Sequence, residues 1–366
     1  MSEIRRRDFL GAAGRAALGA AAVTSLAAPH RARAARPDRR IKVAQIGSGH
    51  AHAAGKMDAF RKLADDYEVV GVAEPDPELR RAAERSRVYD GLKWMSEDEL
   101  LGTGGLEVVA VETEVTALVP TALRCVVAGK HLHLDKPAGP SFAQYKRLMD
   151  EAAGRGLVVQ MGYMFRHNPA FQFCFHAVRE GWLGEVFALD GVIGKYVADD
   201  RRAPLAQFAG GTMFELGCHL IDAMVAVLGK PDRVTAYLRR TRPETDELAD
   251  NTLAVFEYPK ATGTIRSALV EVEGQKRRQF VVCGDEGTVD IRPLEPPKLL
   301  VALAAARGEL KRGYQEVPLE PMPGRYDEQL LDLARTVRGE KENDYPPAHD
   351  LAAHEAILRA SGMPVD

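Results

Sequence analysis

The sequence predicts an α/β protein: a doubly wound parallel sheet followed by an α+β domain with a large, open, mostly antiparallel sheet. From residue 41 to about 165, short apolar runs alternate with helical runs, a pattern typical of parallel strands with crossover helices. After about residue 186, strand-like runs follow one another without helices between them, which favours antiparallel pairing. The 366 residues are enough for two domains, which we expect at 40–165 and 166–366.

The first 34 residues predict an export signal. Arg5-Arg6-Arg7-Asp8-Phe9-Leu10 precedes an apolar stretch, and Ala32-Arg33-Ala34 places small residues around a cleavage point, as in twin-arginine signals. A disordered basic tail is the alternative. Arg15 and Pro29 interrupt the apolar stretch, so we expect no membrane anchoring. The mature protein is then expected in the periplasm or another extracytoplasmic compartment.

Composition is that of a globular enzyme. Hydrophobic residues make up 46% and charged residues 28%, and the net charge is −3. A mildly acidic chain offers no electrostatic reason to expect nucleic acid or an anionic membrane as a partner. The four cysteines are widely spaced, without a C-x-x-C pair or zinc spacing, and we expect them to pack as small buried residues.

In the first domain, strands are expected at 41–46, 69–73, near Trp94, at 108–111, just before Asp135, and at 157–161. Helices are expected at 50–63, 77–87, from Ser96, at 120–128 and at 141–154, and Ser96-x-x-Glu99 has the form of a capping box.

In the second domain, strands are expected at 186–196, 233–239, 252–258, 261–272, 279–283 and 288–291, separated by turn signals. Helices are expected at 169–181, 212–228 and 349–361.

Gly47-Ser48-Gly49 lies between a strand and a helix, the context that a dinucleotide fingerprint requires. Glycines there let the backbone turn tightly and approach a pyrophosphate at the helix N-terminus. His52 stands at the third glycine position, so it must splay the helix or point aside. An ordinary strand–turn–helix is the alternative.

Glu74 ends the second strand, where an acid can bind ribose hydroxyls and repel a 2′-phosphate. This favours NAD over NADP, although Arg80 and Arg81 are near enough to interact with a phosphate. A solvated loop acid is the alternative.

Lys136 follows a short buried strand and precedes Pro137. Because ligands of open α/β sheets bind at the carboxyl ends of strands, Lys136 is expected at the mouth of a cleft.

Glu215, His219 and Asp222 are spaced i, i+4, i+7 and share one helix face. A histidine is the natural general base near neutral pH, and a neighbouring carboxylate can orient it. Thr212-x-x-Glu215 also fits a capping box, so Glu215 has a purely structural alternative.

No metal is expected. His50 and His52, and His131 and His133, form i, i+2 pairs, but no carboxylate or cysteine cluster accompanies them at ligand spacing.

Four segments together resemble the glucose–fructose oxidoreductase / inositol dehydrogenase (Gfo/Idh/MocA) family, over nearly all of the chain after the signal. They are Ala128-Gly129-Lys130-His131…Asp135-Lys136-Pro137, the stretch 161–169 (MGYMFRHNP), Leu183-Gly184-Glu185-Val186, and Gly210-Gly211…Glu215…His219…Asp222.

The resemblance implies an N-terminal Rossmann domain, a C-terminal sheet that often forms an oligomer interface, and a nicotinamide-dependent oxidoreductase. It implies that Lys136 polarises the reacting C–O group, that His219 takes the hydroxyl proton, and that Glu215 holds the place of the family's aspartate. Tyr163, Arg166 and Asp222 are expected on the substrate side. Cofactor contacts are expected from Gly47, Ser48, Gly49, His50, Ala51, Glu74, Thr113, Asp135 and Lys136.

The chain departs from the family pattern at His52, at the two exchanged acids Asp135 and Glu215, and in the loop Thr113-Glu114-Val115-Thr116-Ala117-Leu118, which replaces T-P-N-x-x-H. We therefore expect oxidation of a sugar, polyol or related carbohydrate by hydride transfer, with a tightly bound and recycled cofactor because free NAD is scarce outside the cytoplasm. Redox-neutral glycoside cleavage by oxidation, elimination and reduction is one alternative. A non-catalytic binding protein is the other.

Overall fold

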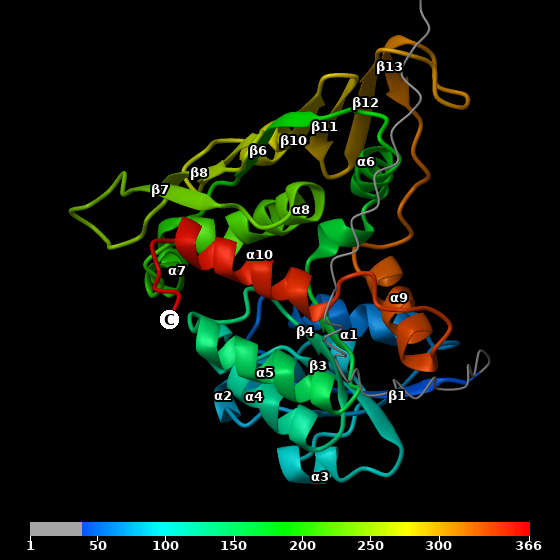
Figure 1. Ribbon diagram of the computed structural model, residues 1–366. Helices are drawn as coiled ribbons and strands as arrows, with labels where there is room; N and C mark the ends of the chain where they lie inside the picture. The colour runs from blue at the N-terminus through cyan, green and yellow to red at the C-terminus, as the bar shows by residue number, and fades with distance from the viewer. Residues whose placement is uncertain (1–38) are drawn as a thin grey trace, which may run out of the picture. The chain divides into compact units, whose positions relative to one another are not determined.

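The computed structural model describes residues 39–366, so the expected export signal lies outside the described residues. All of the described residues belong to one compact unit. It contains two sheets, one parallel and one mostly antiparallel, as predicted (Figure 1). The division at residue 165 stays a prediction. Within residues 39–366, no helix has both the length and the apolar character that crossing a membrane requires.

The first sheet is parallel and buried on both faces. Its strands, in spatial order, are β2 (Tyr67–Ala73), β1 (Ile41–Ile46), β3 (Leu106–Val111), β4 (His131–Leu134) and β5 (Val159–Met161). Their near-continuous apolar sequences fit helix-covered sheets. The helices of this part are α1 (Ala53–Lys62), α2 (Pro77–Glu84), α3 (Glu97–Leu101), α4 (Val115–Val127) and α5 (Phe142–Gly154).

The second sheet has eight strands in the order β13-β12-β11-β10-β6-β9-β8-β7, and only the β6–β9 pair is parallel. The strands are β6 (Val186–Gly194), β7 (Arg233–Arg239), β8 (Asn251–Glu257), β9 (Thr262–Ala268), β10 (Gln279–Gly284), β11 (Gly287–Leu294), β12 (Pro297–Leu303) and β13 (Gly313–Val317). The remaining helices are α6 (Pro169–Arg179), α7 (Ala203–Ala206), α8 (Cys218–Leu228), α9 (Asp327–Arg338) and α10 (Pro347–Ala360).

Helix α9 returns the chain to the first sheet. Its residues Leu330, Leu333, Ala334 and Val337 join the apolar cluster that contains Val43 and other residues of the first sheet. Strands β12 and β13 and helix α9 were not predicted, although the apolar residues of α9 recur at helical spacing. A helix from the C-terminal part of the chain therefore packs against the first sheet.

Three other expectations were wrong in detail. The helix expected at 120–128 begins at Val115, with Pro120 inside it rather than at its start. The strand expected near Trp94 is a single bridge to Val72. The helix expected at 212–228 is regular only from Cys218, because Met213–Gly217 forms a π-helical turn. The Ser96–Glu99 capping box is confirmed.

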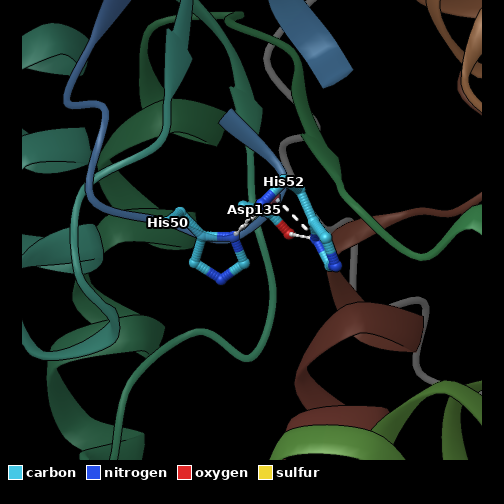
Figure 2. Close-up of side chains that lie close together, drawn as sticks. All are labelled: His50, His52 and Asp135. Carbon is cyan, nitrogen blue, oxygen red and sulfur yellow. Dashed lines mark hydrogen bonds and ion pairs between the residues drawn. The ribbon is translucent and has the colours of Figure 1, made fainter. Parts of the chain in front are cut away.

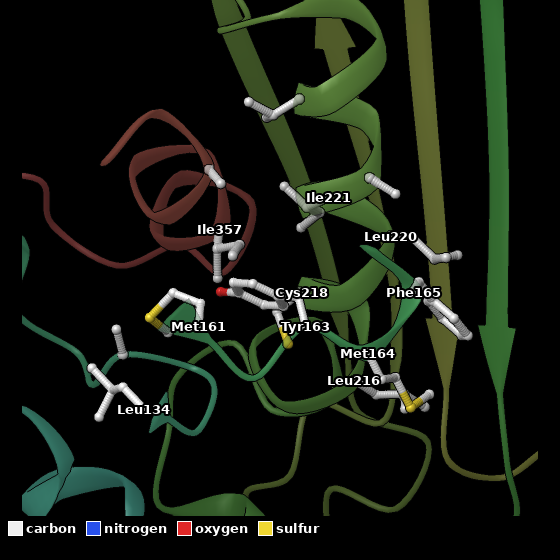
Figure 3. Packing of buried hydrophobic residues seen from close by; sticks show 14 of the residues in the cluster. Leu134, Met161, Tyr163, Met164, Phe165, Leu216, Cys218, Leu220, Ile221 and Ile357 are labelled. Atoms are coloured by element: carbon white, nitrogen blue, oxygen red, sulfur yellow. The ribbon is translucent and has the colours of Figure 1, made fainter. Parts of the chain in front are cut away.

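One apolar core runs from the first sheet to the second. Figure 3 shows Leu134 and Met161, at the ends of β4 and β5, in the same cluster as Tyr163, Cys218 and Ile357. Helix α8 packs against β6 and β9, and α10 packs against both α8 and α5. The strand ends of the first sheet therefore face α8 across a packed interface.

The buried histidine His354 makes the stability of the protein depend on pH. His354 is 1% exposed, neither of its ring nitrogens has a hydrogen-bond partner among the described residues, and it packs against Tyr145. Burial lowers the pKa of His354 to about 3. Below about pH 6.5 the His354 side chain of the unfolded chain binds a proton, whereas that of the folded protein stays neutral until about pH 3. The free energy of unfolding therefore decreases as the pH falls from 6.5 towards 3.

The parent protein should lose unfolding free energy between pH 7 and pH 5, partly because His354 binds a proton in the unfolded chain alone. We expect this loss to be smaller by about 2 kcal/mol in His354→Phe, which lacks that proton site. Urea titrations at both pH values measure this. His176→Phe, at an exposed position of α6, is the control and should leave the loss as in the parent. An equal loss in the His354 variant and the parent would contradict the assignment.

Candidate active site

A single row of residues across the first sheet carries most of the candidate site. The last residues of the strands are in register, so that Ala73, Ile46, Val111, Leu134 and Met161 lie side by side. The next residues along the chain, Glu74, Gly47, Glu112 and Asp135, therefore emerge next to one another. Ligands of doubly wound sheets bind at this edge, where the strand order reverses between β1 and β3.

Gly47 holds the loop close to the neighbouring strand. Its φ is +91°, and a Cβ atom there would lie 2.5 Å from the backbone nitrogen of Thr113. Only glycine fits such a position. No side chain caps the first turn of α1, which leaves amide hydrogens for an anion such as a pyrophosphate. The residues present thus fit a dinucleotide at this loop.

Glu74 is fixed against the same loop. Its Oε2 accepts hydrogen bonds from the Ser48 backbone nitrogen at 2.6 Å and from the Ser48 hydroxyl at 2.8 Å. The side chain is buried rather than a solvated loop acid. Arg80 lies over the Trp94 ring and bonds Glu84, so it is engaged away from the loop.

Asp135 contacts both His50 and His52, which follow the glycine loop (Figure 2). Its Oδ2 lies 3.1 Å from Nδ1 of His50 and 3.1 Å from Nδ1 of His52, and the Lys136 backbone nitrogen donates to its Oδ1 at 2.6 Å. Burial opposes the charge of Asp135, but the two histidines outweigh it and hold its pKa well below the ordinary value. His52 thus points aside, towards Asp135, in place of the third glycine.

Glu112 lies beside Asp135 and is fully buried. Neither of its carboxylate oxygens accepts a hydrogen bond from a donor within residues 39–366. Burial, reinforced by the Asp135 carboxylate, raises the pKa of Glu112 well above its ordinary value. Sequence reasoning missed this residue, although its position directly after a predicted strand is the same signal that singled out Glu74.

Lys136 crosses the interface to the turn before α8. Its Nζ donates to the backbone carbonyl of Glu215 at 2.8 Å and lies 4.0 Å from Oε1 of that residue. The side chain is 2% exposed. Burial disfavours its charge, but Cys218, Glu215 and Asp135 outweigh burial and raise the pKa of Lys136. The structure therefore holds a charged ammonium inside the protein.

Glu215 does not cap a helix. It lies in the π-helical turn, where Thr212 makes no capping bond but pairs with Ser267 at 2.8 Å. Both carboxylate oxygens of Glu215 lie 3.4 Å from Nζ of Lys195. Burial opposes its charge, yet Lys136 and Lys195 lower the pKa of Glu215. The capping alternative is therefore wrong, and Lys195 is a site residue that the sequence did not reveal.

His219 is buried between aromatic rings. Tyr163 and Phe165 lie 6.1 and 5.6 Å from its ring centre, and its Nδ1 has no hydrogen-bond partner within residues 39–366. Burial, with the charge of Lys136, lowers the pKa of His219 well below its ordinary value. His219 is a neutral imidazole, and the expected orienting carboxylate does not contact it.

Arg166 and Asp222 lie in a buried ion-pair cluster. Arg166 donates to Asp222 Oδ1 at 2.6 Å and to Asp350 Oδ1 at 2.5 Å, and all three side chains are at most 2% exposed. Burial opposes the charge of Asp222, but the Arg166 guanidinium outweighs burial and lowers the pKa of Asp222 to about 2. Glu215 and Asp222, expected on one helix face, therefore have different partners. Asp222 pairs with Arg166, whereas Glu215 faces Lys136 and Lys195.

A cavity of about 180 Å³ brings the loop, the lysine and the glutamate together. Its lining residues include His50, His52, Lys136 and Glu215, and Glu114 and Val115 of the altered loop. Pro204, Leu205, Gln207 and Phe208 close its other side. His219 does not line it, and neither do Tyr163, Arg166 and Asp222, so their expected roles towards substrate stay predictions.

Comparison with known families matches two models. The first, an oxidoreductase family with an NAD-binding Rossmann fold, covers residues 41–163. The second, the GFO/IDH/MocA C-terminal domain, covers residues 171–290.

Individual proteins of known sequence or structure are also similar to this chain. Trans-1,2-dihydrobenzene-1,2-diol dehydrogenase of Bos taurus is 28% identical over 71% of this chain and 74% of its own length. Levoglucosan dehydrogenase, in complex with NADH and levoglucosan, superposes with a TM-score of 0.74 at 18% identity, over 88% of this chain and 98% of that one. UDP-N-acetylglucosamine 3-dehydrogenase of Acidithiobacillus ferrooxidans has a TM-score of 0.72 at 18% identity, over 88% and 97%. The structural likenesses show the shared fold.

We expect Gly47→Ala to weaken nicotinamide binding at least tenfold, by fluorescence titration with NADH, because a methyl group would push the loop away from Thr113. Gly181→Ala is the matched control, since Gly181 also has positive φ but a Cβ there meets nothing within 4 Å. Both variants bear a strain of about 1–3 kcal/mol. Equal binding by the two variants would show that the loop does not hold the cofactor.

Proposed function

This chain belongs to the GFO/IDH/MocA family of NAD(P)-dependent oxidoreductases, and from that premise we propose that it oxidises a hydroxyl group of a sugar, polyol or related carbohydrate. The observation that carries this proposal is the buried ammonium of Lys136, beside the glycine loop and in contact with the turn before α8. When bound at that loop, a nicotinamide would accept a hydride from the carbon that bears the hydroxyl.

Lys136 is suited to polarise the reacting oxygen. Its ammonium stays charged, and within residues 39–366 only one of its three donors is engaged, by the Glu215 carbonyl. A fixed positive charge in a water-poor cavity stabilises the negative charge that develops on oxygen as the C–O bond gains double-bond character. The carbonyl of Glu215 keeps the ammonium in place before substrate arrives.

His219 is suited to accept the hydroxyl proton. It is neutral, so it carries a free lone pair, and it shares the buried interface with Lys136. The Lys136 charge that lowers its pKa also favours ionisation of the substrate hydroxyl, so proton transfer needs both groups near the same oxygen. Glu215 balances the two lysines and, with Lys195, offers polar contacts for further hydroxyl groups.

We propose NAD as the cofactor. The buried Glu74 carboxylate lies where the ribose of a dinucleotide binds, and a 2′-phosphate would meet its negative charge. Carbohydrate as the substrate class is supported by the levoglucosan and UDP-N-acetylglucosamine dehydrogenases that share the fold. The cavity of 180 Å³ is below the roughly 300 Å³ typical of ligand sites, so we expect Pro204–Phe208 to shift when cofactor and substrate bind.

We further propose a homo-oligomer through the open face of the second sheet. Tyr237 of β7 and Tyr314 of β13 are 48% and 63% exposed, and Leu253 and Val255 of β8 alternate with the buried residues of that strand. Burying such a face against a second copy would remove apolar surface from water. Sedimentation velocity would return a monomer if this proposal fails.

We expect Lys136→Met to lower kcat by about 10²–10³-fold, because the developing charge on oxygen loses its fixed partner. Nicotinamide binding should weaken far less than kcat falls, since the loop and Glu74 are untouched. Steady-state reduction of NAD with a panel of sugars and polyols measures the first, and fluorescence titration the second. Lys146→Met, on the exposed face of α5, controls for loss of a surface charge. A variant as active as the parent would refute the role of Lys136.

We propose export by the signal at 1–34 with the cofactor already bound and recycled. Protein isolated from the periplasmic fraction without added nucleotide is expected to contain about one nicotinamide dinucleotide per chain, identified as NAD by mass spectrometry after denaturation. Its absorbance near the reduced-cofactor band should rise with a donor sugar and fall with an acceptor. Absence of nucleotide would contradict bound export, while glycoside cleavage without net reduction would identify the redox-neutral alternative.

A further inference from the structure

A second feature of the cleft is a partly buried cluster of nitrogen and oxygen atoms beneath the glycine loop. It consists of His50, His52 and Asp135, which point towards one another in Figure 2, and Glu112 lies next to it. One ligand atom of each of these three residues lies within 4.8 Å of the others. Glu112 Oε2 lies 4.0 Å from His50 Nδ1.

The hydrogen bonds of His50 direct its Nδ1 at the Asp135 carboxylate. Its Nε2 lies 3.1 Å from the Lys136 carbonyl oxygen, which can only accept, so that nitrogen must carry the hydrogen. Its Nδ1 lies 3.3 Å from the backbone nitrogen of His52 and 3.1 Å from Oδ2 of Asp135. A proton on Nδ1 stabilises the contact with Asp135, and a metal ion between the two atoms would take the place of that proton.

Glu112 provides a second, independent observation. The side chain is fully buried, and neither oxygen accepts a hydrogen bond from a donor within residues 39–366. A buried carboxyl group without a partner has lost its hydration without compensation, and an ion bound beside it would supply that compensation. Two carboxylates and two imidazoles form a set of ligands that zinc and similar ions accept.

We propose that His50, His52 and Asp135 bind one divalent transition-metal ion of the zinc class, with Glu112 as the carboxylate nearest to the fourth position. Ligands about 2.0–2.1 Å from a tetrahedral zinc lie about 3.3–3.4 Å apart. The observed separation of 3.1 Å between Asp135 Oδ2 and Nδ1 of each histidine fits that spacing, whereas Glu112 Oε2, 4.0 Å from His50 Nδ1, lies outside the group of three and must move closer to bind the ion. This site was not expected from the sequence, because its two carboxylates come from the ends of different strands.

Outer contacts already orient the ligands. His50 donates through Nε2 to the Lys136 carbonyl, the arrangement in which the second nitrogen of a histidine binds metal. The Lys136 backbone nitrogen holds Asp135 Oδ1, which leaves Oδ2 for the ion. The ion would fix the loop between Gly49 and α1 to the segment that carries Lys136.

The chain contains a natural comparison. Asp222, His349 and Asp350 also come within ligand distance of one another, but the Arg166 guanidinium already lies between the two carboxylates there. A second cation would meet that charge. Within residues 39–366, no guanidinium bonds to Asp135 or Glu112 of the cluster at His50.

The test is the metal content of protein prepared without a histidine tag or chelator. Mass spectrometry of the elements is expected to find about one zinc-class ion per chain after dialysis. Glu112→Gln and His52→Ala should retain less than about a tenth of an equivalent, whereas His349→Ala should retain the full content. Circular dichroism confirms that each variant is folded.

Cobalt provides the second measurement. Chelator-treated parent protein should bind one Co²⁺ and show visible bands of a four-coordinate nitrogen and oxygen site, and the Glu112→Gln variant should not. Less than a tenth of an equivalent of metal in the parent, together with no cobalt bands, would overturn the proposal. Nicotinamide content, measured on the same samples, reports separately on the proposed function.

Discussion

The buried charge of Lys136 is the constraint on which the site depends. A charged ammonium inside a protein must be paired, and its partners come from two distant parts of the chain: Asp135 beside it, and Glu215 beyond residue 200. The hydrogen bond to the Glu215 carbonyl fixes the end of β4 against the π-helical turn. The cavity, the neutral His219 and the pairing of Glu215 with Lys195 are all arranged around that contact.

A second buried network ties helix α9 to the same strands. Lys56 of α1 contacts His133 and donates to Gln329 of α9, and His133 in turn pairs with Gln160 at 3.0 Å. Burial lowers the pKa of Lys56, with Asp135 and Glu112 opposing that shift. The cleft thus rests on polar side chains as well as on the apolar core, and the C-terminal part of the chain contributes to both.

The candidate site was predictable as far as strand ends could be located. Gly47, Glu74 and Lys136 each follow an apolar run, and the register of the parallel strands puts such residues side by side. Glu112 has the same position but was missed, since no motif marked it. Helical spacing put Glu215, His219 and Asp222 on one face, yet the π-helical turn and the competing partner Arg166 sent their side chains to different neighbours.

The sequence by itself determined the two kinds of sheet, the glycine loop and the residues that end each strand, because periodicity and turn chemistry are local properties. The tertiary structure decided which of those residues meet. It turned His52 towards Asp135, left Glu112 without a hydrogen-bond donor from residues 39–366, brought Lys195 to Glu215, and returned α9 to the first sheet. These outcomes depend on burial and on competition between charges from distant segments, which no local pattern encodes.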